Sequence, residues 1–68
     1  MTNLITQYGR ALYGARWQSL MAEALGVNER TVRRWGKGEY NVPDGVYEEL
    51  RCVARAKAKE LLALPLPR

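Results

Sequence analysis

The chain has 68 residues, eleven basic and seven acidic, which gives a net charge of +4, and 47% of its residues are hydrophobic. This length fits one domain, and so small a domain buries only about 60% of the surface that its unfolded chain exposes. A single cysteine and no histidine exclude an internal disulfide framework and argue against a zinc site, so we expect no metal and no cofactor.

Apolar residues recur at helical spacing in the amino-terminal part of the chain and predict a helix over residues 3–13. Its apolar face consists of Leu4, Ile5, Tyr8, Ala11 and Leu12. Thr2 or Asn3 is placed to cap this helix, and Gly14 suits its exit. We therefore expect a loop near Gly14 and a second helix after it.

The second helix is predicted over residues 16–25 and ends at Gly26. Its apolar face consists of Trp17, Leu20, Met21, Ala24 and Leu25. A short third helix follows over residues 29–37, weakened late by Gly36 and stopped by Gly38. Asn28 is its expected cap, because its side-chain oxygen can accept from the amide of Arg30 or Thr31.

A fourth helix is predicted over residues 43–64, with Pro43 in its first turn and Asp44 favouring its amino-terminal end. Its apolar stripe consists of Val46, Tyr47, Leu50, Val53, Ala54, Ala58 and Leu61. Pro65 ends it, and residues 65–68 are expected to form a flexible tail. Since no segment alternates as a strand does, the fold class is an all-α, four-helix compact domain over residues 1–64.

The charges fall into three blocks. Residues 28–38 carry four basic side chains against one acidic one, residues 39–50 are acidic, and the chain is again basic from Arg51 onward. A basic balance favours an anionic partner. The run from Arg51 to Lys59 is interpreted as a solvated helix face or as a second contact with DNA.

The segment from Gln18 to Lys37 carries the most informative pattern. Ala22 is small where the next helix crosses, and Gly26 sits where the turn needs a positive φ. Val27 is expected in the core just after this turn. Val32 and Trp35 are expected to face inward from the third helix and so set its angle against the second.

This segment resembles the helix-turn-helix of phage repressors and Cro-like regulators. The resemblance rests on residues 17–27, WQSLMAEALGV, followed by residues 30–35, RTVRRW. It covers about twenty residues, and the surrounding helices fit the same kind of domain. Small regulators of this size also include the anti-CRISPR-associated repressors of phages and mobile elements, which the chain resembles too. It departs from full-length repressors because it has no carboxy-terminal oligomerisation or cleavage domain.

The resemblance implies roles for individual residues on the third helix and near it. The positions that read base edges in the DNA major groove would be Glu29, Arg30, Arg33 and Arg34. The positions that contact the DNA backbone would be Gln18, Asn28, Thr31 and Lys37. Trp17 would either pack in the core or cover the backbone.

The expected partner is double-stranded DNA, bound by a homodimer whose interface is the fourth helix or, as the alternative, the first. We expect a cytoplasmic transcriptional regulator, with no membrane span, no small-molecule effector and no enzymatic activity. A dimeric repressor that covers a promoter at an inverted repeat is the simplest mechanism, although repression and activation both stay open. The main alternative is a small helical protein-interaction module that binds a host factor; RNA binding is disfavoured by the lack of an aromatic platform.

Overall fold

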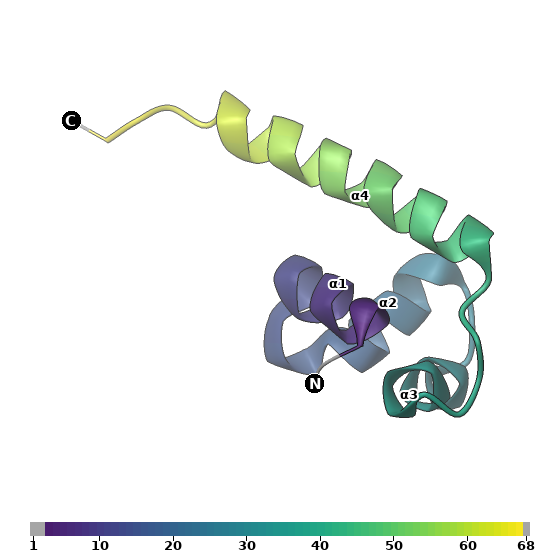
Figure 1. Ribbon diagram of the computed structural model, residues 1–68. Helices are drawn as coiled ribbons and strands as arrows, with labels where there is room; N and C mark the ends of the chain where they lie inside the picture. Colours follow the sequence, from purple (N-terminus) through teal and green to yellow (C-terminus); the bar gives the residue numbers. More distant parts are fainter. Residues whose placement is uncertain (1–2, 68) are drawn as a thin grey trace.

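The computed structural model describes residues 3–67, and all regular structure within that range is helical. The elements are α1 (Leu4–Tyr13), the 3-10 helix η1 (Gly14–Arg16), α2 (Trp17–Leu25), α3 (Glu29–Lys37) and α4 (Asp44–Ala63). In Figure 1, α1, α2 and α3 form a compact group, which we call the body (residues 3–37), and α4 crosses one side of it. The fold is all-α, and each helix begins and ends close to its predicted bounds. Thr2 and Arg68 lie outside the described residues.

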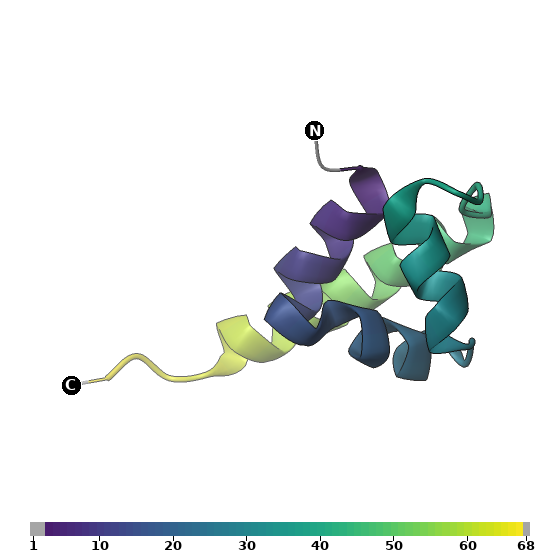
Figure 2. The same cartoon turned by 90° about the horizontal axis from the view of Figure 1, so that it is seen from below.

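The prediction of four separate helices, with a break near Gly14 between the first two, is wrong. Residues 14–16 form η1, so the chain is helical without a break from residue 4 to residue 25, and the described chain has three separate helical stretches. The direction still changes, because Gly14 adopts φ 81° and ψ −148° at the end of α1. This backbone conformation is accessible to glycine at little steric cost. Figure 2 shows α1 and α2 running in different directions as a result.

The indole of Trp17 lies at the centre of the body. A Cβ atom added at Gly9 of α1 would stand 2.1 Å from Trp17 Cε3, and one added at Gly36 of α3 would stand 3.1 Å from its Cη2. The ring therefore fills the space that two glycines leave on two other helices. Trp17 is only 5% exposed, which assigns it to the core and not to a surface that covers DNA.

Asn3 ties the start of α1 to the end of α3. Its Oδ1 accepts a hydrogen bond from the backbone amide of Thr6 at 3.1 Å, which makes it the amino-terminal cap of α1. Its Nδ2 donates to the carbonyl oxygens of Trp35 and Gly36, both at 3.0 Å. The Trp35 carbonyl also accepts from the Gly38 amide at 3.1 Å, and the last carbonyls of a helix have no partner within it. One side chain therefore binds backbone groups at the ends of two helices.

The fully enclosed part of the core is apolar and draws on every α-helix. Its members are Ile5, Trp17, Met21, Ala22, Val32, Trp35 and Leu50. The inward orientation predicted for Val32 and Trp35 is confirmed, as is the burial of Ala22 under the neighbouring helix. Five predicted core positions of the body are wrong, because their side chains are exposed: Leu4, Ala11, Leu20, Ala24 and Val27. Four of them lie on α1 or α2, and Val27 lies in the turn that follows α2.

α4 rests on α1 through its amino-terminal half. Leu50 is completely buried, and the Tyr8 and Tyr47 rings lie 5.6 Å apart. Lys57 makes the last contact, since its Nζ donates to the carbonyl oxygen of Leu12 at 2.9 Å and lies 5.3 Å from the centre of the Tyr13 ring. The Tyr13 hydroxyl is buried there without a hydrogen-bond partner. Burial raises the pKa of that hydroxyl, and the nearby Glu49 carboxylate raises it further.

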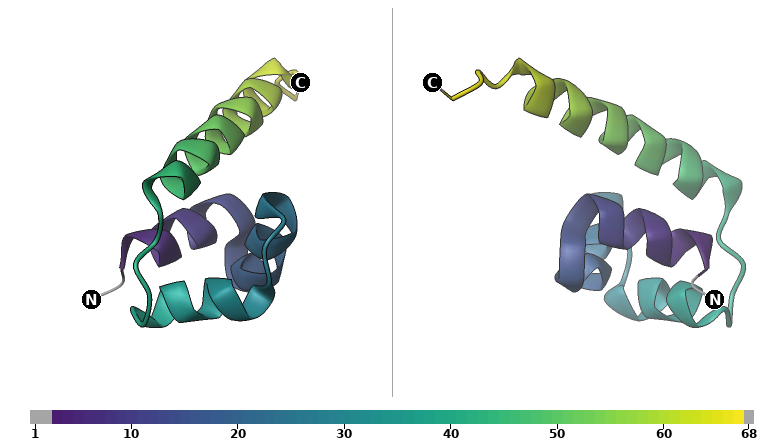
Figure 3. Two further views of the ribbon diagram at one scale, coloured as in Figure 1. Left: turned by 90° about the vertical axis from the view of Figure 1, so that its right-hand side faces the viewer. Right: turned by 60° about the vertical axis from the view of Figure 1, so that its left-hand side comes forward.

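Beyond Lys57 the helix has no neighbour in the described part of the chain. We call residues 58–67 the overhang; the views in Figure 3 show it projecting past the body. It makes the molecule elongated, with principal extents of 47 × 22 × 21 Å. Ala58 and Leu61, which were expected to join the packed stripe, are exposed, because the body ends before they are reached.

Candidate nucleic-acid interface

α3 presents one apolar side to the body and a basic side to solvent. Val32 and Trp35 are buried, and Asn3 holds the helix at its carboxyl end. Four of its nine residues are basic, against one acidic residue. The backbone of this short helix is thus fixed by the core on one side and by Asn3 at its carboxyl end.

The turn between α2 and α3 depends on Gly26. This residue adopts the left-handed conformation, with φ 69°, and its amide donates to carbonyl oxygens of the last turn of α2. The amide of Val27 donates to the carbonyl oxygen of Ala22 at 3.0 Å, a pattern typical of helices that end at a glycine. Asn28 then caps α3 by accepting from the amide of Arg30 at 2.8 Å, which confirms the predicted cap.

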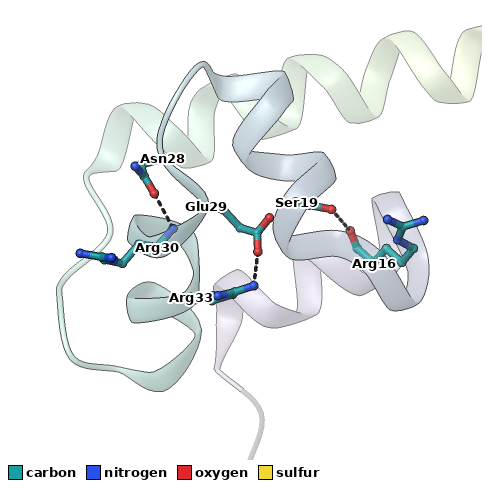
Figure 4. A network of polar contacts seen from close by, with 6 residues as sticks. All are labelled: Arg16, Ser19, Asn28, Glu29, Arg30 and Arg33. Carbon is teal, nitrogen blue, oxygen red and sulfur yellow. Dashed lines mark hydrogen bonds and ion pairs between the residues drawn. The ribbon is translucent and has the colours of Figure 1, made fainter.

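Glu29 and Arg33 form an ion pair one turn apart on α3, through Glu29 Oε2 and Arg33 Nη2. Figure 4 shows that Arg30 extends away from this pair. The Arg30 guanidinium has no hydrogen bond or ion pair with any residue from 3 to 67. The two arginines therefore differ: Arg33 is held by a carboxylate, whereas the Arg30 head group is available to a ligand.

Arg34 lies against the loop that follows α3. Its Nη1 donates to the Tyr40 hydroxyl at 2.8 Å, and its guanidinium carbon stands 5.2 Å from the centre of the Tyr40 ring. Tyr40 itself is 53% exposed. Arg34 is thereby held by the loop that follows α3. Lys37 is exposed at the last position of the helix, and Thr31 is half-buried.

An open hollow of about 260 Å³ lies between the start of α2 and the start of α3, lined by Arg16, Gln18, Ser19 and Glu29. The Ser19 hydroxyl donates to the Arg16 carbonyl oxygen at 3.4 Å, so both residues stay at this rim (Figure 4). Of these residues, the sequence predicted Gln18 and Glu29. Arg16 and Ser19 were missed, although Arg16 is a basic residue close to the predicted backbone contact Gln18.

The structure thus brings Gln18 and Glu29 together at one hollow, with Arg33 joined to Glu29 by an ion pair. Asn28 and Arg30 lie at the start of α3, joined by the capping hydrogen bond. Lys37 is at the opposite end of α3, and Arg34 is turned toward Tyr40. The basic residues from Arg51 to Lys59 belong to α4, a different element from this surface. Tyr40 is a further residue that the sequence did not indicate, since nothing in its local pattern places a loop tyrosine over an arginine.

Within residues 3–67 no helix is long and apolar enough to span a bilayer, and no three potential metal ligands lie together. Comparisons of the chain with protein-family models, with curated proteins and with solved structures find no match. The case for a function therefore depends on the geometry described above and on the resemblance of its sequence pattern.

Proposed function

We propose that this chain is a sequence-specific regulator of transcription that binds double-stranded DNA through a helix-turn-helix formed by α2 and α3. One observation carries the proposal. α3 buries Val32 and Trp35 against the body, and the rest of its surface is basic and exposed around Arg30. A short helix with this division of surfaces fits a major groove, where arginine can bond two atoms of a guanine.

In this arrangement the residues divide into base contacts and backbone contacts. Arg30 is the principal base-reading residue, because its guanidinium is available. Arg33 reads an adjacent base while Glu29 holds it, and Glu29 can accept from a cytosine amino group. At the hollow lined by Arg16, Gln18, Ser19 and Glu29, the basic and polar side chains of Arg16, Gln18 and Ser19 are placed to contact a DNA phosphate, while the Glu29 carboxylate is paired with Arg33.

Three further residues belong to the backbone contacts. Lys37, at the end of α3, and the free amide nitrogen of Asn28 are placed to bind phosphate. Thr31 is half-buried, so its hydroxyl is the group that we expect to contact a phosphate. Arg34 was expected to read bases; its contact with Tyr40 favours a phosphate on the flank of the groove instead.

The regulator acts as a homodimer that covers a promoter. Two copies of α3 about 34 Å apart would enter successive major grooves on one face of the DNA, so the operator is an inverted repeat. Its own promoter is the first sequence to examine. Mobility-shift mapping on the DNA directly upstream of the gene tests this, and protection of an inverted repeat is the expected result.

The sharper test separates base reading from charge. Arg30→Ala should weaken binding to the operator by about 1–3 kcal/mol and binding to scrambled DNA much less, because a base contact acts on one sequence only. Lys37→Ala should weaken binding to both and lower the salt dependence by about one unit. Arg10→Ala, which removes the same charge from an exposed position on α1, is the control and should change little.

A small protein-interaction module is the second candidate, favoured by the exposed leucines of the overhang. It predicts that the Arg30, Arg33 and Lys37 variants bind operator and scrambled duplexes just as the parent does. That outcome at all three positions would remove α3 as the reader of DNA and leave the overhang as the functional surface.

A further inference from the structure

Three basic residues form a row on the outer side of α4, and we call them the basic row. Arg51, Arg55 and Lys59 follow one another at intervals of four residues, which is about 6 Å of helix axis per step. The helix packs on the body through its other side, where Leu50 is buried and Lys57 donates to a carbonyl oxygen of α1. By helical periodicity the basic row therefore points away from the body.

The basic row has no counter-charge in the described part of the chain. Its three side chains are exposed, and none makes a hydrogen bond or an ion pair with any residue from 3 to 67. Glu60 is the only acidic residue after Arg51, and it is five residues from Arg55, which places it on another side of the helix. Like charges at a spacing of four destabilise an isolated helix. The basic row thus weakens α4 in the free chain, and an anionic ligand would remove this repulsion.

The surroundings of the basic row favour a nucleic-acid backbone over a protein or a membrane. A protein interface is typically depleted of charged residues at its core, whereas the centre of this row is Arg55. A helix that lies on a bilayer buries a broad apolar face, and the body covers the apolar face of α4 as far as Lys57. Each DNA strand carries a phosphate about every 3.4 Å of helix axis, so a row of about 12 Å spans about three phosphates. Arginine can bind a phosphate through two parallel hydrogen bonds.

We infer that the basic row binds the backbone of a second DNA duplex, so that one molecule bridges two segments of DNA. α3 and α4 lie on opposite sides of α1 (Figures 1 and 3), and the basic row faces away from the body. The row is therefore on the far side of the molecule from a duplex that α3 reads. It binds a duplex of any sequence, because backbone contacts carry no base information. The inference rests on the proposed function for the first duplex only.

Capture of a second duplex tests the inference. An operator duplex is fixed to a surface, the full chain is bound to it, and a labelled duplex of scrambled sequence is then added. The parent should capture the second duplex, and its affinity should fall roughly 40-fold between about 50 and 200 mM salt, as expected for about three phosphate contacts. The row variant carries Arg51→Gln, Arg55→Gln and Lys59→Gln. It should bind the operator as the parent does and capture the second duplex at least about tenfold more weakly.

Two sets of matched variants separate the basic row from charge in general. Arg55→Gln alone should lower the salt dependence of capture by about one unit, whereas Arg10→Ala, which removes one exposed base from α1, should not. Asp44→Asn with Glu48→Gln removes two exposed carboxylates that lie on the same side of α4 ahead of the row. This pair should strengthen capture, because the carboxylates repel phosphates. All these side chains are exposed, so circular dichroism of each variant should match that of the parent.

The two proposals fail in different ways. A parent that binds the operator but captures no second duplex at low salt would overturn this inference alone. Capture that persists in the row variant would overturn it as well, because α3 of another copy would then hold the second duplex. If Arg30→Ala binds operator and scrambled duplexes just as the parent does, while the row variant loses affinity for both, the proposed function is wrong and the basic row remains a DNA-binding site.

Discussion

The body and the overhang contain the same kinds of side chain in opposite surroundings. Leu50 is completely buried between α4 and the body, and Leu61, eleven residues later on the same side of the helix, is 66% exposed. The difference is not one of hydrophobicity or helix propensity, since both leucines lie in one continuous helix. It depends on whether another element lies opposite. Burial is therefore a property of the neighbours that a residue meets, and changes in the two regions should have very different effects.

The largest effect is expected at Gly9. In Gly9→Ala, the new methyl group would stand 2.1 Å from Trp17 Cε3, and the ring has no room to retreat because Gly36 lies on its other side. Overpacking of this kind should lower the free energy of unfolding by about 3 kcal/mol. Chemical denaturation measures it. Gly45→Ala is the matched control, in open space on α4, and should stabilise by about 0.5–1 kcal/mol. Equal effects at both sites would contradict the assigned packing of Trp17.

Asn3→Ala should have the next largest effect. It removes the cap of α1 and two hydrogen bonds to α3, so we expect a loss of about 2 kcal/mol. Asn3→Ser keeps an oxygen for the cap but cannot reach the α3 carbonyls. Its loss should be about half as large. If the serine variant were as stable as the parent in thermal denaturation, the link between α1 and α3 would contribute nothing.

Tyr13→Phe tests the border between the body and the overhang, where Lys57 of α4 makes its last contact with α1. The Tyr13 hydroxyl is buried without a partner, so its removal should stabilise the chain by about 1 kcal/mol. The ring remains for Lys57. A matched Tyr8→Phe variant, whose hydroxyl is not among the buried unpaired groups, should be nearly neutral. A clear loss of stability in Tyr13→Phe would show that the hydroxyl has a partner in solution.

The smallest effect is expected in the overhang. Leu62→Ala in dilute solution should change the free energy of unfolding by less than about 0.5 kcal/mol, because Leu62 is 87% exposed. Leu50→Ala should cost about 2–5 kcal/mol by the same measurement, because it leaves a cavity. Repeating both at high protein concentration sharpens the comparison: if a second copy covers the overhang, the Leu62 variant should then lose stability as well.

The helices themselves were largely predictable, because their start and stop signals are local. Gly26 and Gly38 both adopt the left-handed conformation that ends a helix, with φ 69° and 78°, and Asn28 caps α3 as its spacing indicates. The inward phase of Val32 and Trp35 also follows from helical periodicity within a single short segment.

The contacts between distant segments were not predictable in this way. Trp17 is enclosed because Gly9 and Gly36 make room for its ring. The pattern of apolar residues in α2 does not indicate these contacts with α1 and α3. The place of Arg34 depends on Tyr40, in a loop without a regular pattern. Leu61 continues the apolar stripe of α4 in the sequence. It has no neighbour because the body ends before Leu61 is reached, which the sequence pattern does not show. Of the candidate site, the sequence predicted which residue types lie on α3 but not which arginine is free.

The position of the two tryptophans has a practical consequence. Trp17 and Trp35 are each 5% exposed, and both lie in the body; the chain has no other tryptophan. Intrinsic fluorescence therefore reports the state of the body and is nearly blind to α4. Circular dichroism at 222 nm instead reports both regions, since α4 contributes 20 helical residues and α1, α2 and α3 contribute 10, 9 and 9. If both signals are followed during heating, a lower midpoint by circular dichroism than by fluorescence would show that α4 melts before the body does.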